Sequence, residues 1–387
     1  MNLPLKYNLR NLLERKGSTA MTALGIGLTV AVLITAFALT TGLKTVFGST
    51  GNPLQLLVLR DGANAELTSQ VAEESYQIIR RLPGIATTAD GTPMVSPEGL
   101  TVVNLPSVDN PEGMNVTVRG MLPIGVAMRN PTVVAGEMLK PGLRQIVVGS
   151  AIAKRYPSAR IGKKVRFGRG YWTVVGVFSA GDSAANSEIW TDLNQLRGDF
   201  EVSGGSSSVL LRAKSPADMA AIKSTIDGDR RLNAQAMPEK EYYASLTSGG
   251  LPLQILGFSV AIIMAVGSAF AATNTMYAAV SRRTREVGTL RALGFPRTTI
   301  LLSFVVESVC LALLGGCLGV LLALPINGLT TGVGNFQTFN ETTFQFRVTP
   351  AAALYGLLFA VAIGALGGFL PAWSASRKPI VQAMRDA

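Results

Sequence analysis

The stretch from residue 274 to residue 325 reads NTMYAAVSRRTREVGTLRALGFPRTTILLSFVVESVCLALLGGCLGVLLALP. Its first half is rich in arginine, and its second half is an apolar run that contains one acidic residue, Glu307. An apolar run longer than roughly 18 residues has the length of a membrane-spanning helix. The stretch therefore predicts a short charged helix at a membrane surface, followed by a span.

Four apolar runs of this length occur in the chain, at residues 19–43, 251–280, 299–324 and 351–373. Each is long enough to cross the roughly 30 Å hydrocarbon core of a bilayer as a helix. The composition agrees, because 48% of the residues are hydrophobic and 15% are charged, against roughly 25% charged in soluble domains. The sequence predicts an α-helical membrane protein with four transmembrane helices.

Residues 44–250, between the first two spans, are too many for a loop and predict an inserted α+β extracytoplasmic domain. Helices are expected at residues 66–82 and 216–226, each after a β-rich stretch. Short β-rich pieces separated by Pro, Gly and Asn predict a β-rich subdomain at about residues 93–200. Within it, KKVRFG and YWTVVGVFS alternate on a two-residue period around a Gly-Arg-Gly turn, which predicts a β-hairpin.

The orientation follows from the basic residues that flank the spans. Lys and Arg gather in residues 1–18, 281–298 and 374–387, which share one side of the membrane if there are four spans. The positive-inside rule makes that side the cytoplasm, so both termini are expected there. Leucines alternate with basic residues before the first span and predict an interfacial amphipathic helix at residues 1–18. The large domain and the loop at residues 325–350 then face outward.

The net charge of the chain is +11, and the outward domain contains one dense basic stretch: Lys154, Arg155, Arg160, Lys163, Lys164, Arg166 and Arg169. Nucleic acid is not expected as a partner, because an outward-facing domain does not meet it. Two interpretations of the stretch stay open. It is a contact for an anionic lipid, partner or substrate, or it is a solvated face, the commoner meaning of a run of charge.

The connection between the second and third spans predicts a short amphipathic helix that ends at Gly294 and Pro296. Its arginines alone satisfy the positive-inside rule and need no other role. Its apolar positions Val287, Leu290 and Leu293 need a cover, which lipid headgroups or a protein groove provides. The candidate site residues of this helix are Arg282, Arg283, Arg285, Glu286, Val287, Gly288, Leu290, Arg291, Ala292, Leu293 and Gly294.

Two polar residues, Asn274 and Glu307, are candidates for a functional contact inside the membrane. An ionisable group within a span is costly unless it is paired. One interpretation is that Glu307 contacts Asn274, or a residue across a dimer, and so holds the helices as a transmitting unit. The other is a protonated or snorkelling Glu307 of little consequence.

The sequence carries no motif for catalysis or for cofactor binding. It contains no His, which removes the commonest general base and metal ligand. The patterns G-x-x-x-x-G-K-[ST], G-x-S-x-G, H-E-x-x-H and C-x-x-C are absent from the 387 residues. We therefore expect a non-catalytic chain with no catalytic residue, no cofactor and no metal.

Residues 283–294, RTREVGTLRALG, are similar to the R-x-R-E-x-G-x-L-R-A-L-G motif of the FtsX/MacB-like family of ABC transporter permeases. The resemblance covers nearly the whole chain. It includes the N-terminal LRNLLERKGSTAMTALGIGLTVA, Asn274, Glu307, the GGCLG run at residues 315–319 and the C-terminal PAWSASRKPIVQAMR. Trp373 and Met384 depart from the family pattern in that last segment.

The resemblance implies a permease subunit of the bacterial inner membrane with two copies of an ABC ATP-binding subunit as partners. Those subunits would bind ATP and Mg²⁺, and the helix at residues 283–294 would be the coupling contact. A second permease copy is expected, as a homodimer, and the outward domain would be moved mechanically. Membrane lipid and a periplasmic adaptor, or membrane fusion protein, are further candidate partners.

Two functions fit this architecture. The first is export or extrusion of a substrate by mechanotransmission, with lipid, lipoprotein, peptide and drug all open as the substrate class. The alternative is an FtsX-like signal transmitter that regulates a periplasmic cell-wall hydrolase. The size of the insert, residues 44–250, favours export. A stand-alone membrane enzyme is disfavoured because no catalytic constellation is present.

Overall fold

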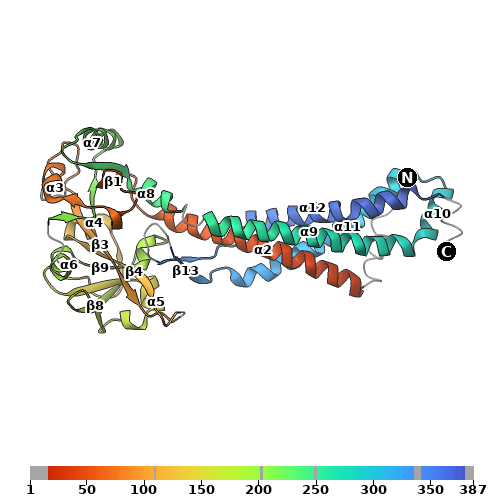
Figure 1. The fold of residues 1–387 in the computed structure, drawn as a ribbon, viewed down its shortest axis with the longest axis horizontal. Coiled ribbons are helices and arrows are strands. Elements are labelled where there is room, and N and C mark those ends of the chain that lie inside the picture. The colour runs from red at the N-terminus through yellow and green to blue at the C-terminus, as the bar shows by residue number, and fades with distance from the viewer. Residues whose placement is uncertain (1–15, 109, 201–203, 248–250, 335–340, 380–387) are drawn as a thin grey trace. The chain divides into compact units, whose positions relative to one another are not determined.

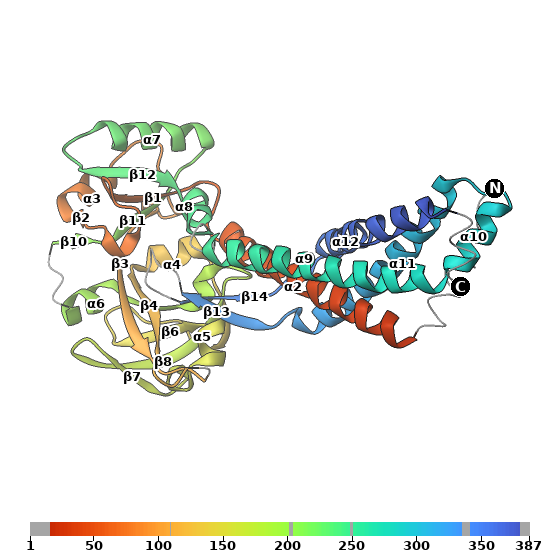
Figure 2. The same ribbon diagram turned by 45° about the vertical axis from the view of Figure 1, so that its right-hand side comes forward.

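The computed structural model describes residues 16–108, 110–200, 204–247, 251–334 and 341–379. The interfacial helix predicted at residues 1–18 and the last part of the tail predicted at residues 374–387 lie outside these ranges. Figures 1 and 2 show the helices and strands from two directions.

The chain divides into two compact units. The first, which we call the helical unit, contains the described residues of Met1–Thr41, Pro252–Leu329 and Gln345–Ala387. The second, which we call the sheet unit, contains those of Gly42–Leu251 and Thr330–Phe344. Each unit is therefore built from segments that are far apart in the sequence.

Long apolar helices make up the helical unit: α2 (Lys16–Ser49, whose last turns belong to the sheet unit), α9 (Leu251–Arg282), α11 (Arg297–Ala323) and α12 (Pro350–Arg377). The short helix α10 (Thr284–Ala292) stands between α9 and α11, and a 3₁₀ turn, η5 (Leu324–Ile326), follows α11. Within the described residues, four helices are long and apolar enough to cross a membrane, with mean hydropathies from 2.1 to 2.5. Their bounds are Gly17–Ser49, Leu251–Arg282, Arg297–Ile326 and Pro350–Arg377.

Large apolar side chains project from these helices. On α9, Ile263 is 71% exposed and Phe270 is 70% exposed, and on α12 Leu366 is 71% exposed. Such side chains occur in continuous rows only where lipid or another protein covers them. The four long helices are therefore membrane helices by composition as well as by length.

Small residues let the membrane helices approach one another closely. Gly315 and Gly319 of α11 face α2, where a Cβ on Gly319 would lie 2.6 Å from the carbonyl oxygen of Gly27. Hydroxyl groups join other pairs of helices, since Thr29 Oγ1 and Ser268 Oγ are 2.7 Å apart and Ser308 Oγ donates to the carbonyl oxygen of Gly364 at 2.7 Å. Without water to drive association, such close contacts hold membrane helices together.

Ten strands of the described chain form one mixed sheet in the sheet unit, in the order β12-β1-β11-β3-β4-β9-β6-β8-β5, with β7 paired to β8. Two pairs, β4–β9 and β6–β8, are parallel, and the others are antiparallel. The strands are β1 (Gln55–Arg60), β3 (Val95–Leu105), β4 (Met114–Met121), β5 (Thr132–Gly136), β6 (Gln145–Gly149), β7 (Lys164–Phe167), β8 (Gly170–Ser179), β9 (Glu188–Asp192), β11 (Ser208–Arg212) and β12 (Ala234–Pro238).

Two small two-stranded sheets complete the strands of this unit: β2 (Val71–Ala72) with β10 (Gly205–Ser206), and β13 (Thr330–Gly334) with β14 (Glu341–Gln345). The connecting helices are short. They are η1 (Glu66–Thr68), α3 (Glu73–Ile79), α4 (Pro123–Arg129), α5 (Ser150–Arg155), η2 (Pro157–Ala159), η3 (Ala184–Ser187), α6 (Leu193–Phe200), α7 (Pro216–Gly228) and α8 (Glu239–Leu246).

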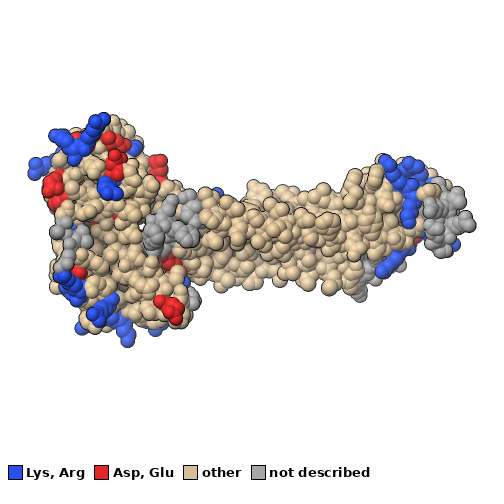
Figure 3. All heavy atoms as spheres, viewed as in Figure 1, with Lys and Arg blue, Asp and Glu red and all other residues tan. Residues whose placement is uncertain are grey.

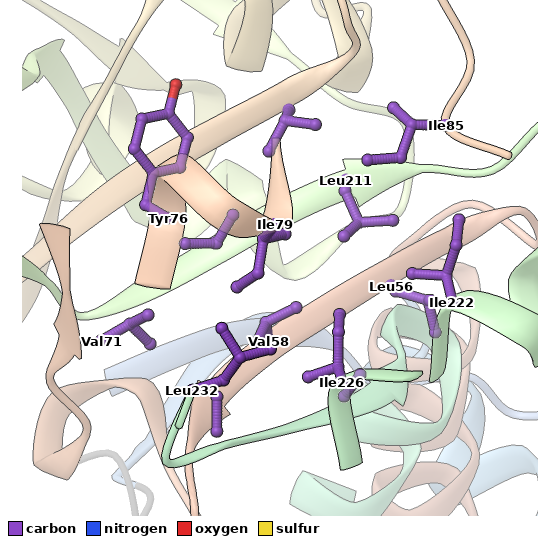
Figure 4. Close-up of a cluster of buried hydrophobic side chains, with 14 of the residues drawn as sticks. Leu56, Val58, Val71, Tyr76, Ile79, Ile85, Leu211, Ile222, Ile226 and Leu232 are labelled. Carbon is purple, nitrogen blue, oxygen red and sulfur yellow. The ribbon is translucent and has the colours of Figure 1, made fainter. Parts of the chain in front are cut away.

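Two large hydrophobic clusters stabilise the sheet unit. In the first, Leu56 and Val58 of β1 pack with Ile79 of α3 and with Ile222 and Ile226 of α7 (Figure 4). The second lies around β4, β6, β8 and β9 and contains Phe167 stacked on Trp172, with ring centroids 4.9 Å apart. The continuous sheet joins the two clusters into one domain.

The predicted fold class is confirmed: a mixed α/β domain is inserted between the first and second of four candidate membrane helices. The predicted hairpin is also confirmed, since Lys164 of β7 pairs with Thr173 of β8 in antiparallel register. The helix predicted at residues 66–82 is wrong in its first half. Val71 and Ala72 pair there with β10, and the helix α3 begins only at Glu73.

The close approach of α11 to α2 predicts a large difference between two glycines. A Cβ on Gly319 would meet the Gly27 carbonyl and lie 2.7 Å from Val30 Cβ, whereas one on Gly267 of α9 would meet nothing within 4 Å. We expect Gly319→Ala to destabilise the purified chain by roughly 1–3 kcal/mol, as overpacking does. Thermal unfolding in detergent measures this, and Gly267→Ala is the control. Equal melting temperatures for the two variants would contradict the packing.

Candidate functional site

The charged helix α10 lies between two membrane helices, where the sequence predicted it. It ends in a left-handed glycine, Gly294, with φ of +92°. The N–H of Phe295 donates to the carbonyl oxygen of Leu290 at 3.1 Å, and the N–H of Gly294 donates to that of Arg291 at 3.1 Å. These two bonds form a Schellman cap, which closes the helix and turns the chain toward α11.

The apolar side of α10 is divided between a buried and an exposed part. Val287 is 5% exposed and packs with Met276 and Val280 of α9 and with Ile300 and Phe304 of α11. Gly288 is buried and Leu290 is half-buried. Leu293, one turn beyond Leu290, is 70% exposed. The helix is thus fixed to the bundle at one end and presents an apolar side chain at the other.

Charged residues surround the exposed part of α10. Arg282, Arg285 and Glu286 are exposed, Ala292 and Gly294 are exposed beside them, and Arg291 is half-buried. On the face of the helical unit seen in Figure 3, Lys and Arg gather at the end that carries α10, while the rest of the visible bundle is largely uncharged. The exposed surface of α10 therefore combines an apolar side chain with guanidinium and carboxylate groups, which suits a protein contact.

A buried ion pair ties the start of α10 to α11. Arg283 Nη1 lies 3.0 Å from Glu307 Oε2, and the two side chains are 12% and 3% exposed. Of the partners that the sequence left open for Glu307, Asn274 is not the one found within this chain, because Asn274 is exposed on α9 and Glu307 pairs with Arg283. Sequence reasoning missed the pair because Arg283 was assigned to the short charged helix, and nothing in the sequence placed its side chain beside Glu307. The pair satisfies a charge that apolar surroundings would otherwise penalise.

The sheet unit contains a second buried charge cluster, which the sequence did not predict. Arg119 of β4 is 1% exposed, and its guanidinium lies 2.7 Å from Glu66, 2.8 Å from Glu98 and 2.8 Å from Glu188. A second arginine, Arg129 at the end of α4, also pairs with Glu98. The pattern that could have revealed the cluster is an arginine in the apolar strand sequence MNVTVRGM. A charge in a strand that is buried on both faces requires counter-charges.

Burial and neighbouring charges shift the pKa values of acidic groups in and beside this cluster. Burial alone would raise the pKa of Glu66, but the Arg119 charge and hydrogen bonds from Arg119 and Ser208 together lower it. Glu239 of α8 behaves differently, because burial raises its pKa and the charge of Arg129, 3.9 Å away, only partly offsets this. Burial also raises the pKa of Tyr243 well above its usual value. The same cluster therefore lowers the pKa of one buried carboxyl group, Glu66, and raises that of another, Glu239.

A cleft of about 470 Å³ opens next to this cluster within the sheet unit. Its walls come from α4, α8, the start of β1 and the segment after β8, and they are mainly polar. Glu239 Oε2 accepts a hydrogen bond from the backbone N–H of Asn52 at 2.9 Å in its wall. Among the described residues, no group of three or more His, Cys, Asp or Glu side chains could hold a metal ion.

Two family profiles match the chain. The profile of the FtsX-like permease C-terminal domain matches residues 258–380, which include α10 and Glu307. The profile of the MacB-like periplasmic core domain matches residues 19–228, more than half of the 387 residues. The chain belongs to the MacB/FtsX-like family of ABC transporter permeases. The permease is accordingly a multi-pass membrane protein with a periplasmic-type domain, and the family resemblance seen in the sequence is confirmed.

Curated relatives of the permease carry the name macrolide export ATP-binding/permease protein MacB. The one from Bdellovibrio bacteriovorus is 24% identical over 415 residues, covering 98% of this chain and 61% of that protein. The one from Bartonella quintana is 25% identical over 402 residues, covering 95% of this chain and 57% of that protein. The chain thus spans less than two thirds of the length of these relatives.

Solved structures with some likeness to the permease are isolated domains. The periplasmic region of MacB from Actinobacillus actinomycetemcomitans matches with a TM-score of 0.37 and 11% identity, over 50% of this chain and 92% of that one. The extracellular domain of the ABC-type transporter YknZ from Gram-positive bacteria matches with a TM-score of 0.36 and 16% identity, over 47% of this chain and 99% of that one.

The Arg119 cluster predicts a pH-dependent stability. Because the pKa of Glu66 is lowered from 4.5 on folding, its charge stabilises the fold at neutral pH, and this contribution is lost as the pH falls through the folded pKa. Glu66→Gln should destabilise the permease chain by roughly 3–5 kcal/mol at pH 7, with a smaller difference from wild type below pH 4.5. Thermal unfolding over a pH series measures this, with the exposed Glu241→Gln as control. A difference that is constant with pH would contradict the assignment.

The Arg283–Glu307 pair predicts an unequal effect of single and double substitutions. Arg283→Leu leaves Glu307 buried without its partner, which should cost roughly 3–5 kcal/mol, whereas replacing both charges by apolar groups is often nearly neutral. We therefore expect Arg283→Leu to lower the melting temperature in detergent and the double variant Arg283→Leu, Glu307→Leu to recover most of the loss. Additive losses in the double variant would show that the two side chains do not depend on each other.

Proposed function

We propose that the permease couples ATP hydrolysis by a partner ATPase to a conformational change of the sheet unit, and that this movement drives export or extrusion of a substrate. In this proposal the chain is a non-catalytic subunit of the inner membrane. The observation that carries the proposal is α10, which is fixed to α9 and α11 by Val287 and presents Leu293 and charged groups at its exposed part.

The attachment of α10 supports a role as the coupling contact. Val287 packs against both neighbouring membrane helices. Arg283 forms an ion pair with Glu307, which lies more than two turns beyond the start of α11. A push on the exposed end of α10 would therefore reach α9 and α11 together, because packed helices move as rigid elements. Helices that dock in a groove of another protein are commonly amphipathic, with apolar side chains that enter the groove and charged side chains beside them.

Partners follow from the family. We propose two copies of an ABC ATP-binding subunit, which bind ATP and Mg²⁺, and a second copy of the permease. The curated relatives are named as ATP-binding and permease proteins together, and no phosphate-binding G-x-x-x-x-G-K-[ST] motif occurs in these 387 residues. The exposed apolar rows of α9, which include Ile263 and Phe270, would be covered by lipid and by that second copy.

The charge distribution supports an orientation. The basic end of the helical unit at α10 would face the cytoplasm under the positive-inside rule, with both termini on that side. The sheet unit would then lie in the periplasm, where a substrate or a periplasmic adaptor is its counterpart. Its exposed basic residues on β7 and in the segment before it, Lys163, Lys164 and Arg166, are available to such a partner.

The alternative function, signal transmission to a periplasmic cell-wall hydrolase, uses the same coupling. The extent of the sheet unit favours export, because one ten-stranded sheet in the described residues, with a polar cleft of about 470 Å³, offers far more surface than a signalling contact needs. Binding of a hydrolase to the purified permease, with no release of lipid, peptide or drug from cells, would support the alternative.

Co-purification tests the coupling contact. Leu293→Asp places a charge on the exposed end of α10 without disturbing the buried Val287, so the chain should fold and reach the membrane but lose its ABC ATPase. Thr298→Asp is the matched control, because it adds the same charge at an exposed position outside α10, in the first turn of α11. If wild type brings down no ABC ATPase, or if Leu293→Asp retains it fully, the proposed coupling is wrong.

A further inference from the structure

The connection between α11 and α12 contains a hairpin that belongs to the other unit. Strand β13 and all of β14 but its last residue belong to the sheet unit, whereas the chain on both sides, up to Leu329 and from Gln345, is part of the helical unit. The sequence predicted only a short outward loop at residues 325–350. Two membrane helices are thus joined through a segment that is built into the domain inserted elsewhere in the chain.

A buried carboxylate fastens this hairpin. Glu341 is 4% exposed, and its Oε1 lies 2.6 Å from Arg155 Nη1 while its Oε2 accepts a hydrogen bond from Tyr156 Oη at 2.7 Å. Thr343 adds two contacts. Its Oγ1 accepts from Arg155 Nη1 at 3.3 Å, and its backbone N–H donates to Ser187 Oγ at 2.9 Å.

These contacts reach the core of the sheet unit. Tyr156 is 1% exposed and packs in the second hydrophobic cluster with Ile152 of α5, and Ser187 ends the 3₁₀ turn η3 directly before β9. Phe344 of β14 is 2% exposed. Charge-assisted hydrogen bonds between desolvated groups are short and resist separation. A surface loop that only joins two helices has no need of a buried carboxylate.

We propose that Glu341 is a positioning residue for mechanotransmission, which fastens the connection of α11 and α12 to the sheet unit through Arg155 and Tyr156. Movement of α11 and α12 would then pull on α5 and η3 directly, in addition to the movement carried by α2 and α9, which continue into the sheet unit along the chain. This inference rests on the proposed function, because it assumes that ATP hydrolysis moves the helical unit.

The test measures nucleotide-dependent hydrogen exchange in the assembled complex of the permease with its ABC ATPase. Backbone amide exchange of α5 and η3 is compared between the nucleotide-free complex and the complex trapped with ATP and vanadate. We expect wild type to show a difference between the two states, and Glu341→Ala to lose that difference while the ATPase still co-purifies. An anchor with a purely structural role would raise exchange equally in both states and leave the nucleotide-dependent difference in place, which would overturn the proposal.

A covalent replacement provides the matched rescue. The Ser187 side chain contacts the Thr343 backbone, so the pair Ser187→Cys and Thr343→Cys is designed to bridge the hairpin to η3. It is introduced together with Glu341→Ala, and the two native cysteines, Cys310 and Cys317, are replaced by Ala. The oxidised protein should regain the nucleotide-dependent difference and lose it again on reduction. An oxidised bridge that restores nothing would overturn the proposal. No nucleotide dependence in wild type, by contrast, would be a failure of the proposed function itself.

Discussion

A guanidinium group that is 1% exposed has to be surrounded by counter-charges, and Arg119 imposes this requirement on the whole sheet unit. Its carboxylate partners come from η1, β3 and β9, so elements far apart in the sequence must meet at one place. Removing any partner leaves a buried charge uncompensated. The two hydrophobic clusters and the charge cluster therefore join the strands and helices of the sheet unit into a single body.

The helical unit follows the same principle with fewer charges. Close glycine contacts hold α11 against α2, and the Arg283–Glu307 pair fixes where α10 begins relative to α11. The exposed end of α10 is thereby connected to packed helices rather than to a flexible loop. The chain passes between this unit and the sheet unit along α2 and α9 and again on either side of the β13–β14 hairpin.

The sequence was sufficient where local pattern determines structure. Hydropathy alone located the four long helices, two-residue alternation located the β7–β8 hairpin, and Gly294 located the end of α10. It failed where distant partners decide. The interaction of Glu66 with Arg119 was not predicted, because it joins positions 53 residues apart. The partner of Glu307 stayed open, because nothing local distinguishes Arg283 from the other arginines. The buried Glu341 was likewise invisible without Arg155 beside it.

The account depends most on α10 being the surface that meets an ABC ATPase. A photoreactive p-benzoylphenylalanine in place of Leu293, which is 70% exposed, tests this directly in intact membranes. After irradiation, mass spectrometry of the cross-linked product identifies what lies against that position. The account predicts a cross-link to an ABC ATP-binding subunit. Cross-linking to lipid alone, or to a protein that is not an ABC ATPase, would contradict it.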